Sequence, residues 1–207
     1  MMKIYDTPAF PNPARVRIAL AEKAATDKVT FVEIDVMNKE HRSKEFLAKN
    51  PDASVPCMEL DDGTFLSHCT AITEYIDGHF DGISLCGKTP KERAVIHMMN
   101  RRTEVGLLDA VAAYFHHGTD GLGPELEVYQ NKEWGMKQRE NALAAMEYLD
   151  GVLANTDYIA GDDFSMADIT AFAGLAFADF AEVEIAEKLK NLIAWRAKVA
   201  ARPSIAG

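Results

Sequence analysis

The stretch from Asn50 to Ile76, NPDASVPCMELDDGTFLSHCTAITEYI, is the most informative part of this chain about its fold. Its dipeptide Val55-Pro56 precedes a short segment in which apolar residues alternate, and Asp62-Gly63 is typical of a β-hairpin turn. A second short strand, 64–66, follows. From Ser67 onward the apolar residues recur at helical spacing. The stretch therefore predicts a hairpin followed directly by a helix.

The Val55-Pro56 dipeptide also suggests what this stretch binds. Proline has no N–H to donate to a strand ladder, and an X-Pro bond loses little by being cis. Such a bend leaves the backbone of Val55 free to pair with an extended peptide. The free N–H groups at the start of the following helix favour an anion such as a carboxylate. We therefore expect a peptide-like ligand that carries a carboxylate.

Composition and charge narrow the function classes. The chain has 207 residues, 48% of them hydrophobic, and a net charge of -10, which disfavours a nucleic-acid or anionic-lipid surface. Its three cysteines have no metal-ligand spacing, so we expect reduced thiols and no metal. The start of the chain lacks the apolar core of a signal peptide. We expect a cytoplasmic protein that binds neither nucleic acid nor membrane.

Residues 1 to about 80 predict the order β-α-β-α-β-β-α. A strand at 3–5 is followed by a helix that we expect Asn12 to cap, with Pro13 at its first position. The β-rich segment 29–34 is the second strand, parallel to the first. One or two helical turns at 43–49 end at Asn50-Pro51. The glycines and the lack of periodicity in 81–88 mark this segment as a linker.

From residue 89 to residue 207 the pattern is helical throughout. Thr89 and Glu92 form a predicted capping box for a long helix from Pro90 to about residue 117, and Gly118 closes it. We expect Pro124 to open a second long helix that runs to about residue 152. A further capping box, Ser165 with Asp168, begins a helix that is too apolar for the surface, and that helix should form the core.

The motifs together resemble the cytosolic glutathione transferases, most closely their theta-like, fungal and bacterial branch. The resemblance rests on Asn50-Pro51, Val55-Pro56, Asp62-Gly63-Thr64, the segment 161–169 and the closing Ala201-Arg202-Pro203. It implies an α/β, thioredoxin-like domain (1–80) that binds glutathione, the linker 81–88 and an all-helical domain (89–207). It also implies a homodimer in which the thiolate of glutathione, the co-substrate, attacks small apolar electrophiles.

The resemblance assigns glutathione contacts residue by residue. The backbone of Val55, before Pro56, would pair with the cysteinyl unit. His41 would meet the glycyl carboxylate, and an exposed loop histidine is the equally weighted alternative. His68 and Cys69 stand where the family usually has an acidic residue and serine, which hold the γ-glutamyl end. This difference has three possible consequences: glutathione binds more weakly, another acid takes the place of residue 68, or the ligand is a different one. Ala53 replaces a common glycine, which predicts a turn without positive φ.

The group that activates the thiol is not evident from the sequence. Phe10 stands where related classes carry serine or cysteine, and Asn12 is a nearby candidate donor. Tyr5 and Thr7 are further candidates, and the backbone with the helix dipole is another. His116 or His117 would act as general base, directly or through a water, although a histidine at a helix end is also favourable structurally.

The electrophile would contact Phe10, Tyr114 and Phe115, although aromatic residues at helical spacing more often belong to a core. Two other functions fit the same fold. One is a glutathione-fold binding protein without transferase activity, which Phe10 and His68 favour. The other is a glutathione-dependent thiol–disulfide reductase, which the lack of cysteine at position 10 disfavours.

Overall fold

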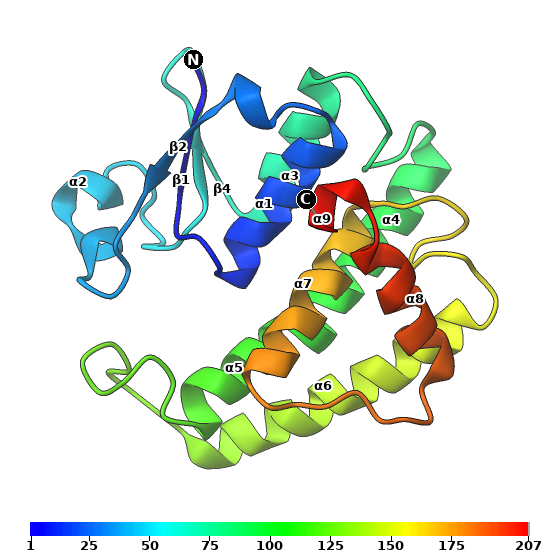
Figure 1. The fold of residues 1–207 in the computed structure, drawn as a ribbon. Coiled ribbons are helices and arrows are strands. Elements are labelled where there is room, and N and C mark those ends of the chain that lie inside the picture. The colour runs from blue at the N-terminus through cyan, green and yellow to red at the C-terminus, as the bar shows by residue number, and fades with distance from the viewer. Residues whose placement is uncertain (207) are drawn as a thin grey trace. The chain divides into compact units, whose positions relative to one another are not determined.

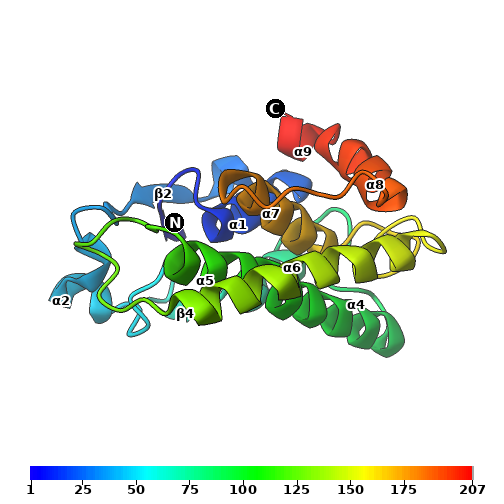
Figure 2. The same cartoon turned by 90° about the horizontal axis from the view of Figure 1, so that it is seen from below.

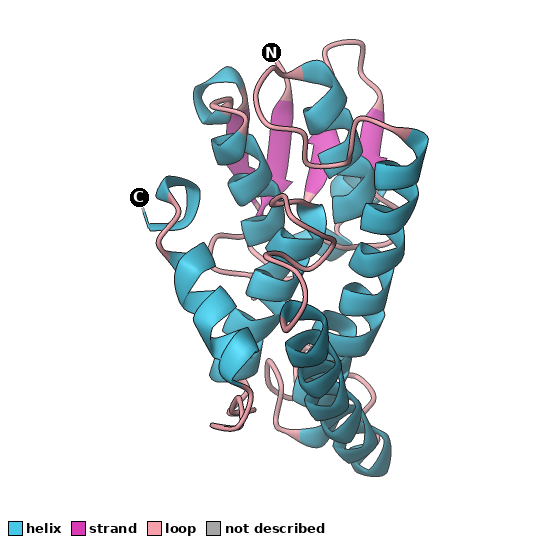
Figure 3. Cartoon of the chain, turned by 90° about the vertical axis from the view of Figure 1, so that its right-hand side faces the viewer, coloured by secondary structure: helices cyan, strands magenta, loops and turns pink. Residues whose placement is uncertain are grey.

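The computed structural model describes residues 1–206 and divides into two compact units, the amino-terminal unit (Met1–Leu85) and the helical unit (Cys86–Gly207) (Figure 1). The amino-terminal unit contains a four-stranded sheet in the order β2-β1-β3-β4 (Figure 3). The strands are β1 (Lys3–Asp6), β2 (Thr30–Glu33), β3 (Cys57–Glu59) and β4 (Phe65–Ser67). β1 and β2 are parallel, and β3 and β4 form an antiparallel hairpin, as the sequence predicts. β1 and β3 are also antiparallel.

The helices of the amino-terminal unit are α1 (Pro11–Glu22), α2 (Lys44–Leu47) and α3 (Cys69–His79), with 3₁₀ turns η1 (Thr26–Lys28) and η2 (Glu40–Arg42). α1 and α3 pack against each other beside the sheet, while α2 lies on its other side (Figure 1). Fully buried Ile4, Leu20, Met58, Ile72 and Ile76 fill the core. The predicted order β-α-β-α-β-β-α is confirmed.

Two ion pairs, each with a buried carboxylate, hold this unit together. Lys23 at the end of α1 is 5% exposed, and its Nζ donates to Asp77 Oδ1 on α3 (2.9 Å) and to the Ile83 carbonyl (3.0 Å). Arg17 donates two hydrogen bonds to the fully buried carboxylate of Asp6, at 2.7 and 3.0 Å. Because a buried charge without a partner is costly, each pair couples its two segments tightly.

The helical unit contains α4 (Pro90–Thr103), a π-helical segment η3 (Glu104–Leu108), α5 (Asp109–Gly118), α6 (Lys132–Leu153), α7 (Met166–Phe180), α8 (Lys190–Ala200) and α9 (Pro203–Ala206). Figure 2 shows α5 and α6 running side by side, and α7 packs against α4, η3 and α5. The predicted all-helical character and the two predicted capping boxes are confirmed. The expectation that α7 forms the core is confirmed as well, because most of its residues are buried.

The prediction that Pro124 opens the second long helix is wrong. α6 begins at Lys132, and Asn131 is its N-cap, accepting a hydrogen bond from the backbone N–H of Trp134. Gly121 and Gly123 have positive φ, and the Gln130 side chain donates to two carbonyl groups, so residues 119–131 form a folded loop instead. Of the helices in residues 1–206, none has both the length and the hydrophobicity that crossing a membrane requires.

Candidate active site

The turn before β3 presents an unpaired peptide backbone. The Val55–Pro56 bond is cis, as the sequence suggests. The buried side chain of Asn50 donates to the Ser54 carbonyl (2.7 Å) and holds the turn, while the Val55 side chain packs on a small apolar cluster. Within residues 1–206, neither the N–H nor the carbonyl of Val55 has a hydrogen-bond partner. These groups are therefore available to an extended peptide.

Ala53 in the same turn corrects one expectation. Its φ is +51°, so the turn does adopt the left-handed conformation that glycine favours, and alanine bears that conformation here. The turn also places Asp52 beside the start of α3. Asp52 Oδ2 lies 3.1 Å from His68 Nε2, and both side chains are at least half exposed.

His68 and Cys69 occupy the start of α3 in different ways. His68 is the N-cap with φ +65°, and its side chain makes no capping hydrogen bond, because its imidazole pairs with Asp52. Cys69 is buried, and its Sγ donates to the Asn12 carbonyl at 3.4 Å. The structure thus brings Asp52, a carboxylate that the sequence did not single out, to the place where His68 replaces the usual acid.

Asn12 is not the N-cap of α1. The helix begins at Pro11, because proline suits the first helical position, and Phe10 is the N-cap. The Asn12 side-chain oxygen accepts from Arg15 Nη1 (3.0 Å) and lies 3.6 Å from Cys69 Sγ. Since both partners are donors, they fix the amide with its oxygen toward them. The Asn12 amide nitrogen has no partner in the described part of the chain, so its two N–H groups remain available.

The hydroxyl groups near Asn12 are already engaged. Thr7 Oγ1 donates to the Ile34 carbonyl (2.7 Å), and the Tyr5 hydroxyl donates to Glu59 Oε2 (2.5 Å). Burial, together with the Glu59 carboxylate, raises the pKa of Tyr5 to about 12. Both hydroxyl protons are therefore directed at acceptors of the protein itself, whereas the Asn12 N–H groups have no acceptor among residues 1–206.

His41 is buried, so it is not an exposed loop histidine. It lies in η2, only 7% exposed, and its Nδ1 has no partner within residues 1–206. Burial is the main cause that lowers the pKa of His41, and the positive charge of Arg42 adds to it. A neutral imidazole with one ring nitrogen unpaired can still bind a ligand by hydrogen bonding.

Four of the remaining site residues predicted from the sequence lie near the end of α5: Tyr114, Phe115, His116 and His117. Phe10 lies at the start of α1. The Phe115 ring packs against Phe177 and Phe180, with centroids 5.5 Å away in each case, so Phe115 belongs to an aromatic cluster of the helical unit. Tyr114 is partly exposed, and the Arg139 guanidinium lies 5.9 Å from its ring centroid. Phe10 is also partly exposed.

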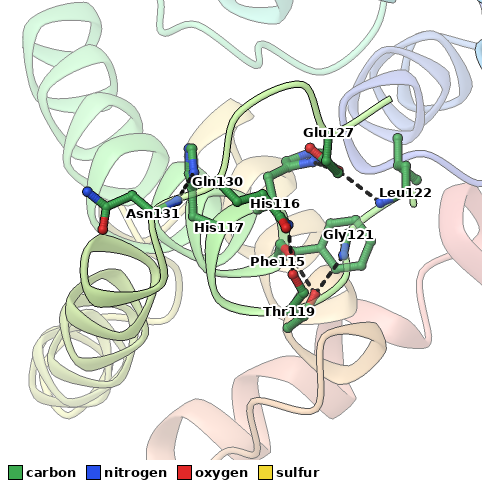
Figure 4. A network of polar contacts seen from close by, with 9 residues as sticks. All are labelled: Phe115, His116, His117, Thr119, Gly121, Leu122, Glu127, Gln130 and Asn131. Carbon is green, nitrogen blue, oxygen red and sulfur yellow. Dashed lines mark hydrogen bonds and ion pairs between the residues drawn. The ribbon is translucent and has the colours of Figure 1, made fainter. Parts of the chain in front are cut away.

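The two histidines at the end of α5 have different partners (Figure 4). His116 Nδ1 lies 2.6 Å from Glu127 Oε1, whereas His117 Nδ1 accepts a hydrogen bond from the Asn131 N–H (3.2 Å). Sequence reasoning missed Glu127, because nothing local relates it to a histidine eleven positions earlier. No group of three or more metal-ligating side chains occurs in residues 1–206.

Comparison with known proteins gives a consistent result. The family model described as the glutathione S-transferase N-terminal domain matches residues 1–78, and the one for the C-terminal domain matches residues 94–203. The chain is 57% identical to "Glutathione S-transferase 2" of Saccharomyces cerevisiae over 204 residues, which cover 99% of this chain and 88% of the relative.

Two solved structures are similarly close. A glutathione S-transferase domain-containing protein of Marinobacter aquaeolei has 65% identity and a TM-score of 0.97, with 98% of this chain and 99% of the other covered. Gtt2 of Saccharomyces cerevisiae has 56% identity and a TM-score of 0.96, with 99% and 98% covered. The α/β, thioredoxin-like first part and the helical second part that the sequence predicts are thereby confirmed. This chain belongs to the glutathione S-transferase family.

Proposed function

We propose that this glutathione transferase binds glutathione on its amino-terminal unit and conjugates the thiolate to small apolar electrophiles. The observation that carries the proposal is the free peptide backbone of Val55, next to Pro56 in a turn that Asn50 holds. An extended tripeptide supplies the N–H and carbonyl groups that such a backbone lacks. Glutathione would thus pair through its cysteinyl unit with Val55.

The two ends of glutathione would find different partners. The γ-glutamyl carboxylate would approach the first N–H groups of α3, at Cys69, where the helix dipole favours an anion. The γ-glutamyl ammonium would face Asp52. The Asp52 carboxylate also pairs with His68, so a protonated His68 would not repel the ammonium without compensation. The unpaired ring nitrogen of His41 supports a role in binding the glycyl carboxylate.

Activation of the thiol requires that the thiolate be favoured over the free thiol, whose pKa is about 8.5. We assign Asn12 to this task, because its oxygen is held by Arg15 and Cys69 while its N–H groups have no acceptor among residues 1–206. In the reaction the S–H bond breaks, the proton passes to a histidine, and the electron pair stays on sulfur. His116 or His117, directly or through a water, would accept this proton.

The remaining assignments follow the family resemblance. Phe10, Tyr114 and Phe115 are the residues proposed to contact the apolar electrophile. We also propose that the chain forms a homodimer, acts in the cytoplasm and needs no metal. A net charge of -10 supports the view that it binds neither nucleic acid nor an anionic membrane.

Affinity and turnover together test this function. Wild-type protein should be retained on immobilised glutathione and should form a thioether with a chlorinated aromatic. Asn12→Ala should still be retained but should lose about 10² in kcat, because removing one preorganised donor costs about that much. Arg101→Ala, on the exposed surface of α4, is the control.

Retention without turnover would contradict conjugation and would indicate a binding protein. Turnover of mixed glutathione disulfides that disappears in Cys69→Ala would instead indicate a thiol–disulfide reductase. The burial of Cys69 against Asn12 opposes that second outcome.

A further inference from the structure

The loop between α5 and α6, residues 119–131, folds back on the end of α5 (Figure 4). Gln130 Nε2 donates to the His116 carbonyl (2.7 Å) and to the Thr119 carbonyl (2.8 Å). Thr119 Oγ1 donates to the Phe115 carbonyl (2.6 Å). These bonds satisfy carbonyl groups that a helix end leaves free. The loop is therefore anchored, and its position relative to α5 is defined.

Glu127 occupies a prepared place in this loop. Its side chain is 10% exposed, and Oε1 accepts both from the Leu122 N–H (2.8 Å) and from His116 Nδ1 (2.6 Å). Gly121, with φ +55°, allows this arrangement, because a Cβ atom there would lie 2.2 Å from Glu127 Oε1. A largely buried carboxylate with a matching glycine is more than a surface ion pair, whose contribution is small.

The hydrogen bonds distinguish the two histidines chemically. Glu127 accepts, so the proton of a neutral His116 must lie on Nδ1, which leaves the lone pair of Nε2 available. Nε2 of His116 has no partner among residues 1–206, and the side chain is 40% exposed. His117 has the opposite arrangement, because its Nδ1 accepts from the Asn131 N–H and its Nε2 must carry the proton. Of these two neutral histidines, only His116 can therefore accept a proton at Nε2.

We propose that Glu127 is the positioning residue of His116, selecting the tautomer in which Nε2 is the proton acceptor. The inference rests on the proposed role of a histidine as general base, and it assigns that role to His116 rather than His117. When Nε2 takes the thiol proton, the carboxylate faces a newly formed imidazolium and stabilises it. The same carboxylate keeps the His116 ring from turning, because the carboxylate is anchored in the loop and the ring belongs to α5.

Four variants and two measurements test this inference. Glu127→Gln retains an oxygen that can accept both hydrogen bonds but removes the charge, and we expect kcat to fall about tenfold. Glu127→Ala removes both the accepting oxygen and the charge. We expect kcat to fall about a hundredfold, with KM for glutathione within about twofold of wild type. Glu125→Gln removes the same charge from an exposed position of the same loop and should leave kcat unchanged.

Nitrogen NMR of the imidazole side chains gives a readout that does not depend on turnover. In wild type the neutral His116 ring should carry its proton on Nδ1, and in Glu127→Ala the proton should move to Nε2. The inference is overturned if the wild-type proton lies on Nε2, or if Glu127→Ala changes neither the tautomer nor kcat. If His116→Ala instead keeps full turnover, the base role fails, while the wild-type nitrogen signals still decide whether Glu127 sets the tautomer.

Discussion

Replacing Asp168 by alanine should destabilise the helical unit far more than the loss of an ordinary helix cap. The side chain is fully buried at the start of α7. Oδ1 accepts from the Ile159 N–H (2.9 Å) and from Trp195 Nε1 (3.0 Å). Oδ2 accepts from the N–H and the hydroxyl of Ser165, both at 3.0 Å. One carboxylate thus joins three separate segments of the unit.

The magnitude follows from the donors that alanine would leave buried without an acceptor. Three N–H groups, at about 1 to 2 kcal/mol each, give a loss of about 3 to 6 kcal/mol in the free energy of unfolding. Ser165→Ala is the matched control, because it removes the cap hydroxyl but leaves the carboxylate, and it should cost about 1 kcal/mol. Urea denaturation, followed by Trp195 fluorescence and by circular dichroism, measures both.

The pH dependence provides a second test of the same group. Burial raises the pKa of Asp168 from 3.8 to about 6, against the opposing effect of its donors. The folded state then binds this proton more tightly than the unfolded state. The resulting stabilisation of the folded state is complete below pH 3.8 and is lost as the pH rises through about 6. The difference corresponds to about 3 kcal/mol. Asp168→Asn lacks this dependence, so its deficit relative to wild type should be larger at pH 4 than at pH 7. A cost of Asp168→Ala no greater than that of Ser165→Ala would show that the buried carboxylate contributes no more than an ordinary helix cap.

Two further substitutions test the packing of each unit. Lys23→Ala removes the ammonium that pairs with the largely buried Asp77 carboxylate and should cost about 3 to 5 kcal/mol in urea denaturation, whereas exposed Lys44→Ala should cost less than about 0.5 kcal/mol. Gly135→Ala should cost about 3 kcal/mol, because its Cβ would lie 2.3 Å from the Gly118 nitrogen where α5 and α6 meet. Gly151→Ala in the same helix has free space and should be neutral or slightly stabilising, so equal melting temperatures for the two alanine variants would contradict the close approach.

Features whose cause is local could be predicted from the sequence. The hairpin at Asp62-Gly63 and the capping boxes at Thr89 and Ser165 follow from residues at most three positions apart. The prediction that a helix begins at Pro124 failed, because a proline suits a loop as well as a helix start. The hydrogen bonds of Gln130 to the end of α5 favour the loop. Such contacts cannot be found from local spacing.

The candidate site shows the same division. The free backbone beside Pro56 could be anticipated, because the backbone conformation there depends on the dipeptide itself. The contact between Asn12 and Cys69 could not, since the two residues are 57 positions apart. The pairing of His68 with Asp52 and that of His116 with Glu127 are likewise set by tertiary structure. The residues were present in the sequence, but their partners were not evident.

The ionisation state of bound glutathione shows whether this chain activates the thiol. Glutathione is titrated into the protein at pH 7 while the ultraviolet absorbance of the thiolate is followed. A free thiol of pKa about 8.5 is largely protonated at this pH. We predict that wild-type protein develops a saturable thiolate signal and that Asn12→Ala binds glutathione with a much smaller one. Saturable binding of glutathione to the wild type without a thiolate signal would contradict the account.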